Sequence, residues 1–204
     1  MVMKLFLTSN GLSNLTLEKK FVELLNKDPS EISVIVIGSI VTKKNFKYIN
    51  NLKKQLNHLG IRMIKVANIA KSIKADVFGG CDVIIFMGGN TYYLLDRARK
   101  TGVIRLIKKH ISSGGIYLGI SAGSIIIHKT IEFAGWGKSA DTNLIGLQDL
   151  RGVGIITTAI FPHYRKILHT EIVRFKRNTS YPIQEIRDGE AIIINGKKIE
   201  LIKK

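Results

Sequence analysis

Short β-branched runs alternate with amphipathic segments along the first two thirds of this chain. Buried strands are expected where apolar runs are bounded by glycine or polar residues, at 3–7, 32–37, 61–66, 82–87 and 116–120. Helical spacing of apolar residues lies between them, at 16–26, 44–59, 91–100 and 103–111, with a short helix within 70–78. This alternation is typical of a parallel sheet covered by helices on both faces. We therefore expect a three-layer α/β fold with a mostly parallel sheet.

Two of these helices carry finer expectations. Thr16 is a plausible N-cap for the first helix, since its hydroxyl can accept a hydrogen bond from a free backbone N–H. In the second helix the apolar spacing predicts an inward face formed by Phe46, Ile49, Leu52 and Leu56.

The last third of the chain is less regular. Residues 130–152 show little periodicity and are interpreted as a surface excursion that carries Trp136 and Asp141. A strand at 153–161, a helix at 167–176 and strands at 183–186 and 191–194 follow. Asn195-Gly196 predicts a tight hairpin that pairs 191–194 with 198–202. No repeat, linker or low-complexity tract is seen, so residues 1–204 are expected to form one domain.

The composition limits the partners. The formal net charge of +17 invites a nucleic-acid reading. The lysines, however, are scattered over solvent faces and no nucleic-acid motif accompanies them, so nucleic-acid binding is not favoured. No secretory signal and no membrane-spanning run is found, and Cys81, the single cysteine, permits no internal disulfide. A cytoplasmic location is expected, with Cys81 as a small buried filler.

One motif is typical of a catalytic site. Gly119-x-Ser121-x-Gly123 stands between the strand at 116–120 and a helix expected over 124–129. This is the pattern of a nucleophile elbow, in which a serine on a sharp strand-to-helix turn presents its hydroxyl above the sheet. The N–H of Ala122 at the helix N-terminus is placed to stabilise a developing oxyanion. The sequence therefore predicts a catalytic serine at position 121.

A second loop ends on the same edge of the sheet. Gly88-Gly89-Asn90 follows the strand at 82–87, and the carboxyl ends of parallel strands share one edge. A Gly-Gly turn can bring backbone N–H groups close to a substrate, which makes this loop a candidate for the other half of an oxyanion hole.

A serine nucleophile needs a base and an acid that orients the base. Among five histidines, His163 follows a buried strand, whereas the others lie on helices or too near Ser121 in sequence. The acid is not decided by pattern alone. Asp141 and Asp149 precede the histidine, while Asp188 and Glu190 follow it in a turn.

The chain resembles the S51 serine peptidases, which include dipeptidase E (aspartyl dipeptidase) and cyanophycinase. The resemblance covers most of the chain and rests on three motifs in family order, at residues 86–91, 119–124 and 161–164. It implies a fold similar to class I glutamine amidotransferases, which is flavodoxin-like, with Ser121 as nucleophile and His163 as base. The family's acid precedes a glycine in a late loop, which matches Asp188. Asp141, 22 residues before the histidine, is the second choice and Glu190 the third.

The resemblance implies a cytoplasmic peptidase for short peptides, with N-terminal aspartate as the candidate specificity. The Gly-Glu-Thr-Arg-like segment that binds aspartate in the family is absent, and Arg165, Lys166 or Arg174 is a candidate to replace its arginine. No metal, organic cofactor or membrane partner is expected, and the protein is expected to be a monomer or homodimer. The alternatives are an esterase or amidase that uses the same serine, and a non-catalytic protein that binds a polyanion.

Overall fold

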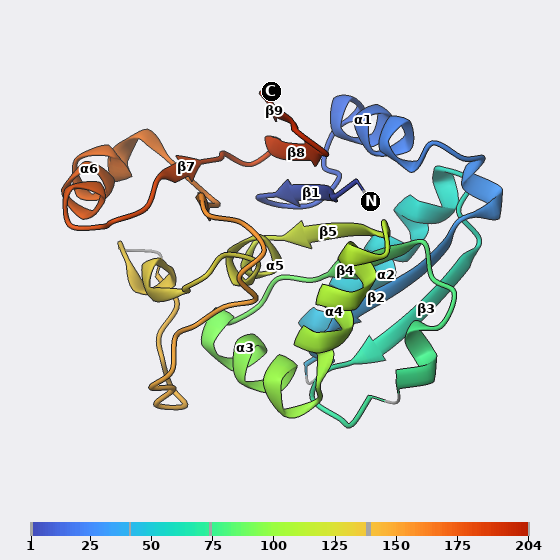
Figure 1. Ribbon diagram of the computed structural model, residues 1–204, viewed down its shortest axis with the longest axis horizontal. Helices are drawn as coiled ribbons and strands as arrows, with labels where there is room; N and C mark the ends of the chain where they lie inside the picture. Colours follow the sequence, from blue (N-terminus) through green and yellow to red (C-terminus); the bar gives the residue numbers. More distant parts are fainter. Residues whose placement is uncertain (1, 41, 74, 138–139, 204) are drawn as a thin grey trace.

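A seven-stranded sheet forms the centre of the protein (Figure 1). The computed structural model describes residues 2–40, 42–73, 75–137 and 140–203. The strands of this sheet are β1 (Lys4–Thr8), β2 (Ser33–Gly38), β3 (Met63–Asn68), β4 (Val83–Phe86), β5 (Ile116–Ile120), β8 (Ala191–Asn195) and β9 (Lys198–Ile202). Their spatial order is β3-β2-β4-β5-β1-β8-β9, in which β1 to β5 are parallel and β8 is antiparallel to both neighbours. The mostly parallel sheet and the C-terminal hairpin are confirmed.

Helices cover both faces of this sheet (Figure 1). One face packs against α3 (Thr91–Lys100), α4 (Val103–Ser112) and α5 (Ala122–Ile126). The other packs against α1 (Leu15–Leu25) and α2 (Lys43–His58). Since successive side chains of a strand point to opposite faces, Leu5 and Leu7 join the first core and Phe6 the second. The three layers are therefore as predicted.

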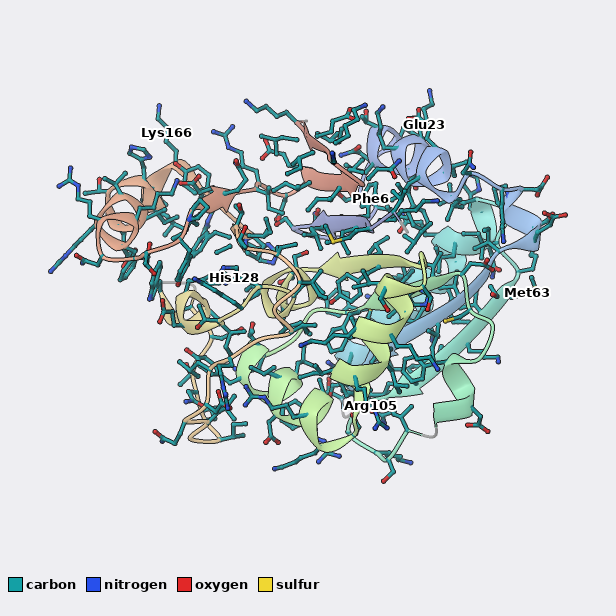
Figure 2. All side chains as sticks on the ribbon, viewed as in Figure 1. Phe6, Glu23, Met63, Arg105, His128 and Lys166 are labelled. Atoms are coloured by element: carbon teal, nitrogen blue, oxygen red, sulfur yellow. The ribbon has the colours of Figure 1, made fainter. Side chains whose placement is uncertain are left out.

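Figure 2 shows Phe6 inside the molecule, whereas Glu23 and Lys166 extend from its outer side. The rings of Phe6 and Phe21 on α1 pack in an edge-to-face arrangement, with 5.7 Å between the ring centroids. Such an edge-to-face pair adds to the apolar area that the two rings bury.

The start of α1 differs from the expectation. Asn14, not Thr16, is the N-cap of α1, and its Oδ1 accepts from the Leu17 N–H at 2.9 Å. Asn14 also donates to the Gly189 carbonyl at 2.9 Å, a long-range contact that local sequence does not reveal.

On α2, Ile49, Leu52 and Leu56 are buried as predicted, but Phe46 is 55% exposed. With 3.6 residues per turn, Phe46 lies about 90° from the centre of the stripe formed by the other three.

The segment after the elbow departs further from expectation. Helix α5 ends at Ile126 and does not reach residue 129. The N–H groups of Val153, Gly154 and Ile155 donate to the carbonyls of Ile126, His128 and Ile127 at 2.7, 3.1 and 3.0 Å. These bonds end the helix, and they also shorten the strand expected at 153–161 to β6 (Ala159–Phe161).

The last third also holds a second, small sheet. Strand β6 pairs in parallel with β7 (Ile183–Glu185), outside the main sheet. A 3-10 turn at Lys166–Leu168 precedes α6 (His169–Arg177). The expected surface excursion is partly wrong, because Ile131 and Phe133 are fully buried around a 3-10 turn at Glu132–Gly135. Residues 138–139 of that excursion lie outside the described residues.

The helix expected within 70–78 is a 3-10 turn at Ala75–Phe78. Lys74, which falls in that expectation, lies outside the described residues. Within the ranges that the structure covers, no helix has the length and apolarity needed to cross a membrane.

Candidate active site

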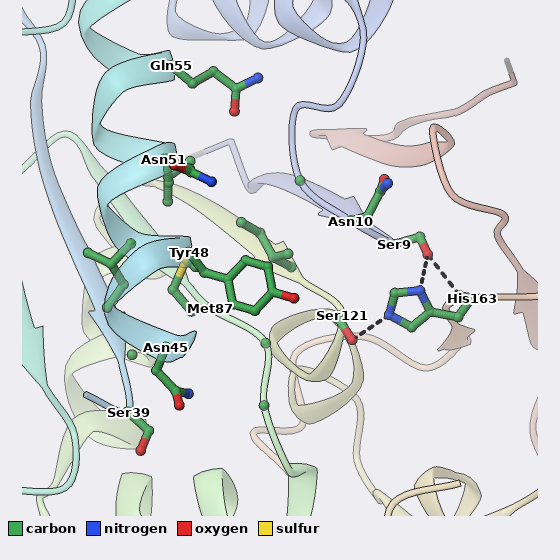
Figure 3. Close-up of a pocket in the computed structure, with 17 residues that line it drawn as sticks. Ser9, Asn10, Ser39, Asn45, Tyr48, Asn51, Gln55, Met87, Ser121 and His163 are labelled. Atoms are coloured by element: carbon green, nitrogen blue, oxygen red, sulfur yellow. Dashed lines mark hydrogen bonds between the residues drawn. The ribbon is translucent and has the colours of Figure 1, made fainter. Parts of the chain in front are cut away.

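Five chain segments meet beyond the carboxyl ends of the strands. Strand β5 leads to Ser121, β1 to Ser9, β4 to Gly88, β6 to His163 and β7 to Asp188. Open parallel sheets bind ligands at this edge, because the loops that follow neighbouring strands converge there. Figure 3 shows Ser121, His163 and Ser9 side by side.

Ser121 lies on a strained turn between β5 and α5. Its φ is 52° and its ψ is −112°, a conformation that L-residues rarely adopt. Small residues make the turn possible, since a Cβ on Gly123 would lie 2.1 Å from the Phe86 carbonyl oxygen and one on Gly119 would lie 2.7 Å from the Gly123 oxygen. The buried Tyr117 hydroxyl donates to that same Gly123 oxygen at 2.7 Å and fixes the start of α5.

His163 joins the serine to an acid. Its Nε2 lies 2.9 Å from Ser121 Oγ, and its Nδ1 lies 2.7 Å from Asp188 Oδ1. A carboxylate accepts only, so this contact selects the tautomer with the proton on Nδ1 and leaves Nε2 to accept from the serine. The arrangement is able to draw the proton from the serine hydroxyl.

The small sheet positions both members of this pair. The Ile186 N–H donates to the Phe161 carbonyl at 2.9 Å, and the Tyr164 N–H donates to the Ile186 carbonyl at 3.0 Å. His163 lies between these two bonds, with φ at 56°. Because β6 leads to His163 and β7 to Asp188, their pairing sets the distance between these two side chains.

Ser9 is a site residue that the sequence did not reveal. It is fully buried, and its Oγ donates to Asp188 Oδ1 at 2.6 Å and accepts from the His163 N–H at 2.8 Å. The only available signal was its place after the first strand, in a turn of polar residues. The hydroxyl therefore holds the acid and the backbone of the base together.

The acid is kept ionised by its neighbours. Partial burial raises the pKa of the Asp188 carboxyl, but hydrogen bonds from Ser9 and His163 and the charge of Arg165 outweigh it, so the pKa lies below its usual value. Arg165 is exposed two residues after the histidine and does not line either cavity beside Ser121 among the described residues.

The other candidate acids lie elsewhere. Asp141 accepts from the N–H and the hydroxyl of Thr91 at the start of α3, at 2.8 and 2.5 Å. Glu190 accepts from the Arg187 N–H at 2.8 Å and shapes the turn that holds Asp188. Asp149 forms ion pairs with Arg99 and Arg151. Of these acids, only Asp188 lies at His163 Nδ1.

The expected oxyanion loop lies against the serine. A Cβ on Gly88 would come within 3.1 Å of Ser121 Cβ, so glycine lets this backbone approach Ser121 closely. Ala122 is buried and its N–H opens α5. Because α5 has only five residues, it contributes the single Ala122 N–H beside Ser121 and not the dipole of a long helix. Asn90 instead caps α3, and its side chain bonds Tyr93 and Thr142.

Two cavities meet at Ser121. The larger, about 710 Å³, is lined by α2 residues and by the ends of β1, β2 and β4. Figure 3 shows Asn45, Tyr48, Asn51 and Gln55 along α2 on the side opposite Ser121 and His163. The smaller, about 90 Å³, lies between the elbow and the segment around Trp136. Gly89, Ser121 and His163 line both cavities, so a chain bound across Ser121 has room on either side.

A serine on a strand-to-helix turn, bonded to a histidine that is bonded to a carboxylate, is the arrangement of serine hydrolases. The family model of peptidase family S51 matches residues 5–202. The chain belongs to this family.

Individual relatives agree with this assignment. An uncharacterized peptidase of Listeria monocytogenes serovar 1/2a is 29% identical over 202 residues, which cover 96% of each protein. An uncharacterized peptidase of Pasteurella multocida is 30% identical over 119 residues, 57% of each. Peptidase E of Salmonella arizonae is 27% identical over 128 residues, which span 63% of this chain but only 53% of that protein.

Solved structures give the same fold. A candidate peptidase E protein from Listeria monocytogenes EGD-e superposes with a TM-score of 0.81 at 27% identity, and the match covers all of both chains. A peptidase from an acI-B1 Actinobacterium gives a TM-score of 0.71 at 18% identity, over all of this chain and 88% of the other, and supports the fold alone.

Proposed function

We propose that this protein is a serine-type peptidase that hydrolyses short peptides. The observation that carries the proposal is the continuous hydrogen-bond chain from Ser121 Oγ through His163 to Asp188. Membership of peptidase family S51 and the peptidase E relatives support the same reaction class.

The proposed reaction is acyl transfer in two halves. Ser121 Oγ bonds to the scissile carbonyl carbon while its proton moves to His163 Nε2. The C–N bond then breaks, and His163 gives that proton to the leaving amine. Water attacks the acyl-enzyme by the same route in reverse, which releases the acid product and restores the serine. Asp188 holds the imidazole in the required tautomer and stabilises its cationic form.

Backbone N–H groups are assigned to the oxyanion. The Ala122 N–H and the loop of Gly88 and Gly89 flank Ser121, where negative charge develops on the carbonyl oxygen. Donors that are fixed before the reaction stabilise this charge without reorganising.

The resemblance suggests N-terminal aspartate as substrate. Neither cavity is lined by a lysine or arginine among the described residues, and Arg165 lies beside the acid instead. The proposed substrate class is therefore short peptides, without a stated N-terminal residue.

Hydrolysis of a panel of dipeptides, tripeptides and simple esters tests the proposal. For Asp188→Asn we expect kcat/KM on peptides to fall by about 10²- to 10⁴-fold, the range for loss of effective acid–base catalysis. Asp149→Asn is the control, because Asp149 was also a candidate acid in the sequence but lies in an exposed ion pair with Arg151. We expect kcat/KM of this variant to stay within about twofold of the wild-type value. Equal effects of the two changes would reject the role of Asp188, and turnover of esters alone would favour an esterase.

A further inference from the structure

The larger cavity opens at the end of the core that lies between the sheet and α2. Successive side chains of a strand point to opposite faces, and Ile85 of β4 and Leu118 of β5 point into this core. Met87 and Ile120 lie two residues further along and continue the same alternation. Both are only partly buried, pack against this core and line the cavity. The core on this face is therefore open to the cavity through these two apolar side chains, which we call the apolar floor.

The apolar floor lies beside the nucleophile. Ile120 directly precedes Ser121 in the chain. Met87 directly precedes Gly88, where a Cβ would come within 3.1 Å of Ser121 Cβ. A ligand group that rests on the floor is therefore next to the carbonyl that Ser121 attacks. In a bound peptide, this is the place of a residue that adjoins the scissile bond.

Close packing against glycine backbone holds the floor in position. A Cβ on Gly38 would lie 3.2 Å from Met87 Cγ and 3.2 Å from Ile49 Cδ1 on α2. A Cβ on Gly11 would lie 3.4 Å from Ile120 Cδ1. Because such close packing leaves little room for movement, the floor is a fixed surface and not a loose end of the core.

The outer wall of the cavity adds an aromatic ring and amide groups. Tyr48 on α2 lines the cavity, and Figure 3 shows its ring beside Met87, between α2 and Ser121. The carboxamides of Asn10 and Asn51 line the same cavity. Ligand pockets typically combine apolar and aromatic surface with a few polar groups that orient the ligand. The part of the cavity next to Ser121 thus has the surroundings that suit an apolar side chain, with amide groups available for the peptide backbone.

We propose that the larger cavity binds an apolar side chain of the peptide directly beside the scissile bond, and that Met87, Ile120 and Tyr48 determine this specificity. The inference rests on the proposed function, since it requires Ser121 to be the nucleophile. The volume of about 710 Å³ leaves room for a leucine or phenylalanine side chain, because pockets for small ligands span roughly 300–1,000 Å³. A polar side chain of the same shape loses its hydration on this floor without gaining a partner there.

Tetraalanine peptides that carry leucine or asparagine at one position test the proposal, because these two side chains have similar shapes. Mass spectrometry locates the cleaved bond, so that each position flanking it is measured separately. For the wild type we expect kcat/KM to be at least about tenfold higher for leucine than for asparagine at one of the two flanking positions. In Met87→Gln, which keeps an unbranched side chain of similar length, this ratio should fall below about threefold. Met63→Gln makes the same change at an exposed position of β3 and should keep the wild-type ratio.

A second variant tests the aromatic wall without touching the core. Tyr48 and Phe46 are both 55% exposed on α2, but only Tyr48 lines the cavity. We expect Tyr48→Ala to lower the ratio of leucine to asparagine by about threefold or more. Phe46→Ala removes an equally exposed ring from the same helix, and it should keep the wild-type ratio.

Labelling of Ser121 by a fluorophosphonate separates this inference from the proposed function. A wild type that is labelled and cleaves peptides, but has a ratio near one at both flanking positions, would overturn the inference alone. An unchanged ratio in both Met87→Gln and Tyr48→Ala would do the same, even if both variants lost overall activity. A wild type that is not labelled, or that cleaves no peptide, would reject the proposed function and this inference with it.

Discussion

Ser9 determines how the acid and the base sit relative to each other. Its hydroxyl donates a hydrogen bond to Asp188 and accepts one from the His163 backbone N–H. The side chain makes no direct contact with Ser121 in any hydrogen bond of the described residues, so we regard it as a positioning residue. It is fully buried, so water cannot take its place without a rearrangement.

Replacing Ser9 should therefore impair turnover more than binding. A hydrogen bond to a charged group contributes about 1.5–3 kcal/mol, so we expect Ser9→Ala to lower kcat by roughly 10- to 100-fold. KM should change little, because the hydroxyl is bonded to the acid and the base. Steady-state kinetics on one short peptide measure both constants. Ser112→Ala, on the exposed end of α4, is the matched control. A raised KM with unchanged kcat would contradict the positioning role.

At the scale of elements, the elbow depends on contacts that hold the first turn of α5. Tyr117 is fully buried on β5, and burial raises the pKa of its hydroxyl, so it remains a protonated donor to the Gly123 carbonyl at any physiological pH. The single proton of the buried Ser124 hydroxyl is shared between the carbonyl oxygens of Thr8 and Gly119, each 2.8 Å from its Oγ. These bonds tie a five-residue helix to β1 and β5.

Removing the Tyr117 hydroxyl tests this support. Tyr117→Phe leaves the Gly123 carbonyl without this donor in a buried position, which costs about 1–3 kcal/mol. We expect the free energy of unfolding in urea to fall by that amount. Tyr93→Phe on α3 removes a hydroxyl that forms no hydrogen bond within the described part of the chain. Its free energy of unfolding should lie within about 0.5 kcal/mol of the wild-type value. Equal stabilities of the two variants would contradict the role of Tyr117.

Local sequence patterns predicted correctly the elements that depend on neighbouring residues alone. The β-branched runs of β2 and β4 and the Asn195-Gly196 turn each carry their signal in a few neighbouring residues. The errors arise where distant segments compete for the same groups. Residues 153–155 take the carbonyls that would have continued α5, and Gly189 engages Asn14 at the start of α1.

The site residues also separate into those that local sequence reveals and those that it does not. Ser121 and His163 lie in motifs that are visible in sequence, and the choice among acids needed the resemblance. Ser9 has no local signature, because its partners are 154 and 179 residues away. The cavity shared by Asp141 and Ser121 likewise follows from how the segment around Trp136 folds back on the elbow.

At the scale of the whole molecule, the site exists only in the complete fold. Ser121 follows a strand of the main sheet, whereas His163 and Asp188 follow the strands of the small sheet, and Ser9, directly after β1, links the two. The net charge of +17 gives long-range attraction for anions, but the described walls of both cavities carry no lysine or arginine. The positive charge of the whole chain is therefore not continued in the described walls of the two cavities.

The most direct test is whether Ser121 is activated in the folded protein. Intact-mass spectrometry after treatment with a fluorophosphonate probe measures this for the wild type, Ser121→Ala and His163→Ala. We predict one stoichiometric adduct on the wild type, mapped to Ser121, and none on either variant under the same conditions. A folded wild type without an adduct, or an adduct that persists in His163→Ala at the wild-type rate, would contradict a serine activated by His163.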